Sequence, residues 1–438
     1  MNNIKLTFAG FVCLFVISCI AIEAQAGVSN QEEAAKKILG ATGIQGGFIV
    51  HVGCGHGRLT AALRAGDSYL VHGLDKDAKS VEQAREYIQS LGLYGKVSVD
   101  QCNGRHLPYI DNLVNLLVSE DLGSISMDEV MRVLCPNGVA YIKKGRNWKK
   151  IVKKRPKELD DWTHYLHDAS NNAVSHDTVV GPPRRMQWVG SPRWARHHDR
   201  MSSVSAVVSA GGRIFYILDE ASHFSILVGP KWSLIARDAF NGTILWKRPV
   251  SKWHTHLWPL KSGPAQLPRR LVAEGERVYV TLTLDGPLTA LDAATGKTIR
   301  KYEETKGTEE AILVDDVLFL LVNKEAKEPE FANLKRIGGA YGGKFWDEQP
   351  REVMAVLAES GDVLWSVKSR VLPGTLAADG KRVYFHDGKS VVSLDRNTGD
   401  QKWRSDPIDR ADTILSFYIP ILVVYEDVVF FSGGETAG

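Results

Sequence analysis

Apolar and polar residues follow two different patterns along the chain, and the change between them divides it into two regions. Between residues 27 and 148, short apolar runs such as Phe48–Val52 and Tyr69–Leu74 alternate with segments whose apolar residues recur at helical spacing. One such helical stripe consists of Val81, Ala84 and Ile88. Buried strands that alternate with amphipathic helices are typical of a parallel, doubly wound sheet, so we predict an α/β domain over 27–148.

Residues 183–438 instead contain a repeated β pattern, apolar-x-apolar-Asp-x-x-Thr/Asn-Gly-x-x-x-Trp, in which x is any residue. With small departures, its copies are Leu234–Trp246, Leu288–Arg300, Met354–Trp365 and Val392–Trp403. The Asp can bind backbone N–H groups of a tight turn in which Gly takes positive φ, and the Trp can pack between repeats. This repetition predicts an all-β propeller of about four and a half blades, and therefore an incomplete ring.

The composition fits two globular domains and limits the classes of function. Of the 438 residues, 44% are apolar and 24% are charged, which is ordinary for globular proteins. The 54 Lys and Arg residues nearly balance the 51 Asp and Glu residues, which leaves a formal charge of +3. A dedicated nucleic-acid-binding protein usually has a strong basic excess, so we expect no nucleic-acid partner.

The N-terminus has the pattern of an export signal. Lys5 precedes an uncharged apolar run, Leu6–Ile22, which is followed by the cleavage pattern Ala24–Ala26. We therefore predict a signal peptide over residues 1–26 and a periplasmic or extracellular protein. Alternatively, Cys19 ends a sequence that resembles a bacterial lipobox, which would make the protein a lipoprotein. Only in that case do we expect attachment to a membrane.

A glycine-rich loop follows the first predicted strand. Gly53, Gly55 and Gly57 stand immediately before a predicted helix, where glycines let a ligand approach the backbone and the free N–H groups of the helix. Asp75 ends the second predicted strand, 22 residues after Gly53. A carboxylate at that place can accept hydrogen bonds from the hydroxyls of a ribose. Together these residues predict a site for a nucleotide-type cofactor.

Four segments of this domain resemble the motifs of class I S-adenosylmethionine-dependent methyltransferases. They are Val50–Gly57, Gly73–Asp75, Asn103–Pro108 and Glu129–Gly138. The resemblance implies a Rossmann-like fold with S-adenosylmethionine as the cofactor. By the same resemblance, Gly53, Gly55 and Gly57 would surround the methionine part. Asp75 would hold the ribose, and Asn103 would bind the amino group of the adenine.

The domain departs from that family at three places. The family usually has Asp where Asn103 stands. It ends its sheet with an antiparallel hairpin, whereas here we expect the chain to pass from Ile142 into a basic linker that leads to the propeller over residues 149–182. No Asn/Asp-Pro-Pro-Tyr follows the fourth predicted strand, where Ser119 stands, which argues against methylation of a base or amide nitrogen by that route. Because methyl transfer depends mainly on positioning for an in-line displacement, we name no catalytic residue.

The repeats resemble those of pyrroloquinoline-quinone-type β-propellers, found in quinoprotein dehydrogenases and in a lipoprotein that helps to assemble outer-membrane proteins. Asp161–Tyr165 resembles the Asp-Trp-x-x-Tyr start of quinoprotein propellers, and Trp188 would belong to an N-terminal strand that closes the ring. The dehydrogenases often carry a vicinal Cys pair, but no Cys follows Cys135, so we do not expect pyrroloquinoline quinone as a cofactor. The whole combination resembles exported proteins of planctomycete-type bacteria.

Clusters of polar side chains near the start of the propeller allow two interpretations. The clusters are Asp160, Asp161, His164, His167 and Asp168, then Arg193–Asp199, and then Trp253–Trp258. They could form a metal or anionic-ligand site at the propeller mouth, or hydrogen-bonded packing between blades. We favour packing and name no metal ligand. The spacing of His51, Cys54, His56 and His106 near the glycine loop also fits no standard metal site.

Three functions therefore remain open. The first is an exported methyltransferase whose propeller recognises a small molecule or a protein. The second is an extracytoplasmic binding or assembly scaffold that catalyses no reaction. It stays open because S-adenosylmethionine is made in the cytoplasm, so an exported enzyme would lack its methyl donor. The third, a quinone-dependent dehydrogenase, is the least favoured.

Overall fold

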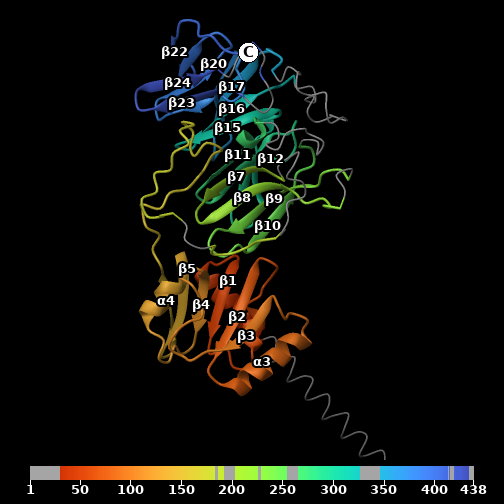
Figure 1. Ribbon diagram of the computed structural model, residues 1–438, viewed down its shortest axis with the longest axis vertical. Coiled ribbons are helices and arrows are strands. Elements are labelled where there is room, and N and C mark those ends of the chain that lie inside the picture. Colours follow the sequence, from red (N-terminus) through yellow and green to blue (C-terminus); the bar gives the residue numbers. More distant parts are fainter. Residues whose placement is uncertain are drawn as a thin grey trace, which may run out of the picture. The chain divides into compact units, whose positions relative to one another are not determined.

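The computed structural model describes residues 30–182, 186–191, 203–224, 228–253, 265–325, 346–412, 414 and 419–433 (Figure 1). The chain forms two compact units. The first ends at Pro156 and also includes Phe240–Leu245, and the second comprises the remaining residues from Lys157 onward. None of the helices in the described part of the chain has the length and apolar character needed to cross a bilayer.

The first unit is an α/β domain built on one six-stranded sheet, in the order β3-β2-β1-β4-β5-β6. The strands are β1 (Gly47–Val52), β2 (Tyr69–Asp75), β3 (Val97–Gln101), β4 (Val114–Ser119), β5 (Leu134–Lys144) and β6 (Asn147–Val152). The helices are one over residues 30–42, α2 (Arg58–Ala62), α3 (Ala78–Ser90) and α4 (Met127–Val133). The pairings among β1 to β5 are parallel. The predicted doubly wound α/β fold is thereby confirmed.

Every residue of β1 is buried, because helices cover both faces of the sheet. Asp77 caps α3 through its side chain, which accepts a hydrogen bond from the backbone N–H of Ser80 at 2.9 Å. The apolar stripe predicted for this helix, Val81, Ala84 and Ile88, is its buried face. The periodicity of the sequence therefore determines which face of α3 packs on the sheet. The loops that follow the strands lie at the carboxyl edge of the sheet.

The expectation that the chain leaves the sheet after Ile142 is wrong. Strand β6 turns back through Gly145 and pairs antiparallel with β5, and the ring of Trp148 stacks on Tyr141 at 4.9 Å between centroids. Trp148 and Ile151 pack on the domain core, whereas most of the lysines between and beside them are exposed. The basic stretch is therefore an edge strand, where charged residues discourage pairing with other chains.

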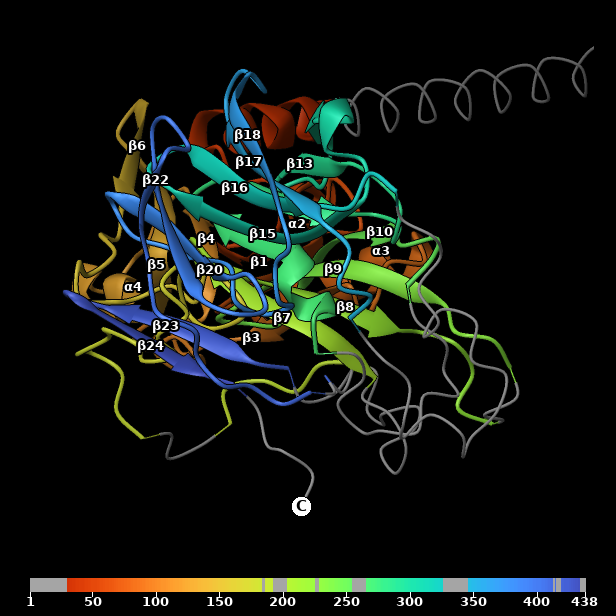
Figure 2. The ribbon, with the colours of Figure 1, turned by 90° about the horizontal axis from the view of Figure 1, so that it is seen from above.

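The second unit consists of small antiparallel sheets, one for each sequence repeat. In the described residues there are four four-stranded sheets and one two-stranded sheet. Their strands are β7 (Val204–Ala210), β8 (Arg213–Asp219), β9 (Trp232–Asp238), β10 (Ile244–Pro249), β11 (Leu271–Glu274), β12 (Arg277–Thr281), β13 (Leu288–Asp292), β14 (Thr298–Lys301), β15 (Thr308–Val314), β16 (Val317–Val322), β17 (Arg351–Leu357), β18 (Val363–Ser369), β19 (Ala377–Ala378), β20 (Arg382–His386), β21 (Val391–Asp395), β22 (Gln401–Arg404), β23 (Ile421–Tyr425) and β24 (Val428–Ser432). Figure 2 shows the sheet of β15 to β18 most clearly. This arrangement confirms the prediction of a propeller-type β region.

The repeated motif forms the turn between the third and fourth strands of a sheet. Asp292 shows how, because its Oδ1 accepts hydrogen bonds from the backbone N–H and the hydroxyl of Thr295, at 2.7 and 2.6 Å. Gly296 then takes φ 69°, in the left-handed region. The motif therefore builds the outer hairpin of the sheet, as its turn residues predict.

Residues 157–182, here called the lead-in segment, take an irregular path along the first strands of all five sheets. Its carbonyl groups accept hydrogen bonds from backbone N–H groups of four of these strands. The donor–acceptor pairs are Ser209–Trp162, Ala273–Thr163, Ala378–Ala169 and Val424–Ser170. The remaining strand, β15, is reached by His164, whose Nε2 accepts a hydrogen bond from the backbone N–H of Leu313 at 3.0 Å. The lead-in segment is therefore an integral part of the β unit.

Candidate functional site

The glycine loop connects β1 to α2 at the carboxyl edge of the first sheet. Gly53, Gly55 and Gly57 all have positive φ, at 74°, 51° and 75°. A Cβ on Gly57 would lie 2.9 Å from the Cβ of Ala84, so this glycine lets α3 approach the loop closely. A Cβ on Gly53 or Gly55 would meet no atom within 4 Å. The loop therefore offers an open, side-chain-free surface of backbone at these two positions.

Asp75 lies next to that loop because β1 and β2 are parallel neighbours. Its Oδ2 accepts a hydrogen bond from the backbone N–H of Gly55 at 2.8 Å, and its Oδ1 accepts one from Asp77 at 3.0 Å. The structure thus brings the predicted glycine and carboxylate together at one edge. Each carboxylate oxygen keeps a lone pair with which it could accept a hydroxyl group.

Asn103 follows β3 at the same edge of the sheet, but its side chain serves its own loop. Its Oδ1 accepts hydrogen bonds from the backbone N–H groups of Arg105 at 2.9 Å and His106 at 3.1 Å. An amide oxygen has two lone pairs, so these two bonds use its acceptor capacity and leave the Nδ2 amino group as a donor. An Asp at this position would have a second carboxylate oxygen that could accept a hydrogen bond from a ligand.

Lys76 was missed by the sequence analysis and lies beside two further glycines of the same edge. A Cβ on Gly104 would lie 1.9 Å from the Cε of Lys76, and a Cβ on Gly123 would lie 2.8 Å from its Nζ. The side chain therefore fills the space between the loops after β3 and β4. Glycines after two consecutive strands, with a Lys directly after Asp75, are the signal that could have indicated this arrangement.

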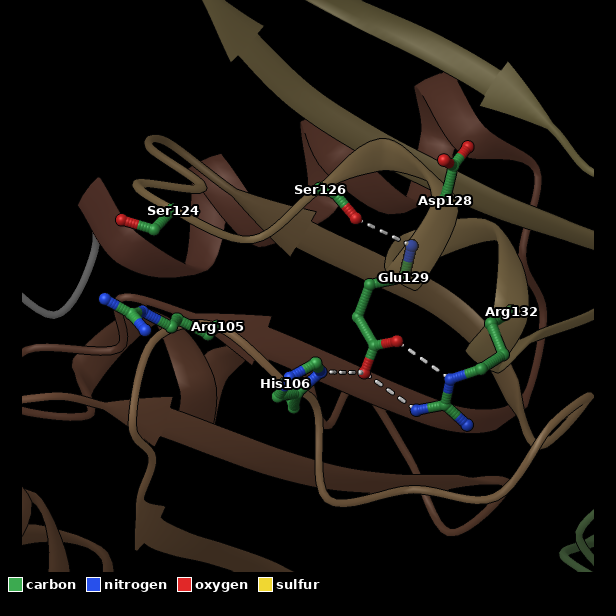
Figure 3. A pocket seen from close by; sticks show the side chains of 7 residues that line it. All are labelled: Arg105, His106, Ser124, Ser126, Asp128, Glu129 and Arg132. Atoms are coloured by element: carbon green, nitrogen blue, oxygen red, sulfur yellow. Dashed lines mark hydrogen bonds and ion pairs between the residues drawn. The ribbon is translucent and has the colours of Figure 1, made fainter.

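A cavity of about 430 Å³ opens beside the Asn103 loop (Figure 3). Its lining residues are Arg105, His106, Ser124, Ser126, Asp128, Glu129 and Arg132. Glu129 organises its wall, because its carboxylate accepts hydrogen bonds from the backbone N–H of Leu107 and from Nε and Nη2 of Arg132, each at 2.8 Å. The hydrogen bonds from Arg132 are the largest cause that lowers the pKa of Glu129 to about 2. The cavity therefore has a fixed ion pair, Glu129 with Arg132, and around it the exposed basic groups of Arg105 and His106, the serine hydroxyls and the carboxylate of Asp128.

Two of the polar residues near the glycine loop lie in the domain core. His51 is buried, and its Nδ1 lies 2.8 Å from the hydroxyl oxygen of Thr60. Burial lowers the pKa of His51 to about 4 and raises the pKa of Cys54 to about 12. A neutral imidazole and a protonated thiol in these positions serve packing and are unsuited to acid–base or nucleophilic chemistry near pH 7.

The polar clusters predicted at the start of the propeller are only partly described by the structure. Asp160, Asp161, His164, His167 and Asp168 belong to the lead-in segment. Arg193–Asp199 and His254–Trp258 lie outside the described residues. Trp253 is described, and its indole Nε1 donates to the hydroxyl of Ser205 at 2.8 Å, which is the packing role expected for it.

Family models match two parts of the chain. A model described as "Methyltransferase domain" matches residues 49–138, which include the glycine loop and Asp75. A model described as "Outer membrane protein assembly factor BamB" matches residues 340–438 in the β unit.

Individual relatives of the chain include methyltransferases. The methyltransferase GfsG of Streptomyces halstedii is 32% identical over 97 residues, which are 20% of this chain and 34% of that protein, so the chain spans about a third of this curated relative. A S-adenosylmethionine-dependent methyltransferase from Aquifex aeolicus is 23% identical, with a TM-score of 0.23, over 26% of this chain and 67% of that one. Geranyl diphosphate C-methyltransferase from Streptomyces coelicolor A3(2) is 19% identical, with a TM-score of 0.24, over 25% of this chain and 44% of that one. The chain therefore carries a Rossmann-like methyltransferase domain followed by a pyrroloquinoline-quinone-type repeat domain.

Proposed function

We propose that the α/β domain binds S-adenosylmethionine at the Gly53–Gly57 loop and transfers its methyl group to an acceptor. The observation that carries this proposal is the hydrogen bond of 2.8 Å between Gly55 N and Asp75 Oδ2, beside an open backbone surface. It supports the proposal because it holds a carboxylate next to a loop that no side chain fills, and a cofactor with a ribose requires such an arrangement. When bound, the cofactor supplies an electrophilic methyl group on a sulfonium.

The residues of this chain would act by binding and orienting. Gly53 and Gly55 leave room for the methionine part, and Asp75 holds the ribose through the lone pairs that its backbone contacts leave free. Methyl transfer depends mainly on holding the two reactants in line, so a site without an evident acid or base is compatible with it. The basic and hydroxyl groups of the neighbouring cavity are suited to an acceptor that carries an anionic group.

The rest of the proposal concerns location and partners. We propose that residues 1–26 direct export, as in the planctomycete-type proteins that the sequence resembles, and that the β unit recognises the acceptor or a partner protein. The match of residues 340–438 to the family described as an outer-membrane protein assembly factor supports a binding role for the β unit. Lipidation at Cys19 would add attachment to a membrane.

A second candidate function is an extracytoplasmic binding scaffold without methyl transfer. It is favoured by the engaged amide oxygen of Asn103 and by the side chain of Lys76, which lies between Gly104 and Gly123. The first feature removes a hydrogen-bond acceptor for the amino group of an adenine, and the second reduces the space for its ring between the loops after β3 and β4.

Calorimetric titration of S-adenosylmethionine into the full chain distinguishes the two functions. We expect micromolar binding that is lost in Asp75→Ala and kept in Asp67→Ala, which removes an exposed carboxylate of the same domain. Circular dichroism checks that each variant is folded. A folded wild-type chain that does not bind the cofactor would overturn the methyltransferase proposal and favour the scaffold.

A further inference from the structure

The lead-in segment brings together three side chains that are suited to a metal ion. Asp160, His167 and His176 each offer a ligand atom, and these atoms all lie within 4.8 Å of one another. His167 is only 3% exposed, and its Nε2 lies 2.7 Å from Asp160 Oδ2. The rings of His167 and His176 meet edge to face, with 5.1 Å between centroids. The polar cluster predicted from the sequence contains Asp160 and His167 but not His176, which lies nine residues after His167.

The surroundings of His167 orient its ring toward this group. Its Nδ1 is buried and lies 3.3 Å from Asp168 Oδ2, and it has no hydrogen-bond partner among the described residues. In metal centres, a ligating histidine usually points its other ring nitrogen at a carboxylate, which fixes the ring and makes the ligand more basic. Asp168 stands in that position when Nε2 of His167 is the ligand atom.

The carboxylate of Asp160 is fixed by hydrogen bonds from its neighbours, as carboxylates that bind metal ions usually are. Its Oδ2 also accepts hydrogen bonds from the backbone N–H of His176 at 2.7 Å and from the hydroxyl of Ser175 at 3.1 Å. Its Oδ1 accepts one from the backbone N–H of Asp161 at 2.8 Å. These contacts fix the carboxylate without using the imidazole ring of His176, which is exposed.

We propose that Asp160, His167 and His176 bind one divalent transition-metal ion, for which Zn²⁺ is the best fit. Two imidazole nitrogens and one carboxylate oxygen form a donor set that suits Zn²⁺, and three protein ligands leave a position for water or another ligand. Metal binding takes the place of the proton between His167 Nε2 and Asp160 Oδ2. His167 then carries its one ring proton on Nδ1, which faces Asp168, and any second proton leaves to solvent. No redox change or co-reactant is involved.

The site would cross-link the lead-in segment at the place where the segment holds the β unit together. Asp160 and His176 flank the stretch whose carbonyl groups accept hydrogen bonds from β7, β11, β19 and β23. A metal ion that joins both ends of this stretch stabilises the folded state by mass action, because the unfolded chain lacks the preformed site. The proposal concerns the β unit and does not depend on cofactor binding by the first domain.

Metal stoichiometry and thermal unfolding of the full chain test the proposal. We expect the wild-type chain, dialysed against Zn²⁺ and analysed for bound metal, to retain one more ion per chain than His176→Ala. Replacing His176 removes the ring but keeps the backbone N–H that holds Asp160, so the fold should survive. His223→Ala, which removes another exposed ring of the β unit, should match the wild type.

Two further readouts make the result decisive. Excess Zn²⁺ should raise the unfolding temperature of the wild type and of His223→Ala by about 5 °C more than that of His176→Ala. Co²⁺ should give visible absorption bands in the wild type that His176→Ala lacks. Equal metal content in wild type and His176→Ala, or a wild type that retains no Zn²⁺, would overturn the proposal.

Discussion

The indole ring of Trp246 lies directly against Gly296, in the hairpin turn of the next sheet. Its Nε1 donates a hydrogen bond to the carbonyl of Ala293 at 2.9 Å, and a Cβ on Gly296 would come within 2.5 Å of the ring. The same relationship joins Trp365 to Gly399. Each sheet therefore closes on the turn of its neighbour, and the repeated Trp and Gly of the sequence are two halves of one contact.

Replacing Gly296 by Ala should destabilise the β unit strongly. The new methyl group would collide with the ring of Trp246 and would also strain a backbone held at φ 69°. We expect a loss of about 2–4 kcal/mol in the free energy of unfolding, measured by urea denaturation. Gly275→Ala is the matched control, because its φ is 55° but its Cβ would meet nothing within 4 Å. If both variants lost the same stability, the close packing of Trp246 would contribute nothing.

The pattern of the repeats predicted that each Gly forms a turn and that each Trp packs between sheets, but not that the two residues meet in one contact. Arg300, which replaces the Trp in one repeat, follows the same rule, since its Nε donates to the carbonyl of Glu359 beside Gly361. Trp188 does likewise, with a hydrogen bond of 2.9 Å to the carbonyl of Ala239. What the sequence could not indicate is the path of the lead-in segment, because its backbone carbonyls hold four of the five first strands and leave no signature in the sequence.

Replacing Asn103 by Asp should strengthen the binding of S-adenosylmethionine. One carboxylate oxygen could keep the contacts with Arg105 N and His106 N, and the other would be free to accept from the amino group of the adenine. A charged acceptor at this place is worth about 1.5–3 kcal/mol, or roughly a tenfold or greater gain in affinity. Calorimetric titration measures it, with the exposed Asn147→Asp as control. Unchanged or weaker binding would place the adenine elsewhere.

The parts of the candidate site differ in how readily the sequence reveals them. Gly55 and Asp75 were predictable, because parallel neighbouring strands must end side by side. Lys76 was missed because its place depends on two glycines far along the chain, Gly104 and Gly123, whose missing side chains leave room for it. Strand β6 was also missed, because the many lysines in its sequence suggested an exposed linker. Only two of its apolar residues, Trp148 and Ile151, pack on the core.

Replacing Glu129 by Gln should destabilise the α/β domain at neutral pH but not in strong acid. The folded-state pKa of Glu129 is lowered from 4.5 to about 2, so its stabilising effect is present above pH 4.5 and is lost as the pH falls toward 2. Gln could still accept from Leu107 N, but it loses the charge that pairs with Arg132. We expect a loss of about 1–3 kcal/mol at pH 7. Unfolding curves of the two proteins between pH 7 and 2 should converge, and a constant gap would contradict this reasoning.

His164 should make the β unit sensitive to mild acid. Burial lowers its pKa from 6.5 to about 3, because a charged imidazolium is poorly solvated inside the protein. Its Nε2 accepts a hydrogen bond from the backbone N–H of Leu313. Between these two pH values the unfolded chain binds a proton that the folded chain does not, so the stability from this group falls as the pH falls from 6.5 toward 3. At pH 5 the loss is about 2 kcal/mol relative to pH 7.

His164→Gln isolates this effect, because an amide oxygen could accept the hydrogen bond from Leu313 without titrating. His51 and His386, whose pKa values burial lowers to about 4, titrate equally in both proteins and cancel in the comparison. Urea unfolding followed by tryptophan fluorescence at pH 7, 6 and 5 should give a wild-type stability that falls more steeply than that of the variant. All tryptophans except Trp148 lie beyond residue 156, so the signal reports mainly on the β unit. Parallel curves would mean that the lead-in segment does not depend on a neutral His164.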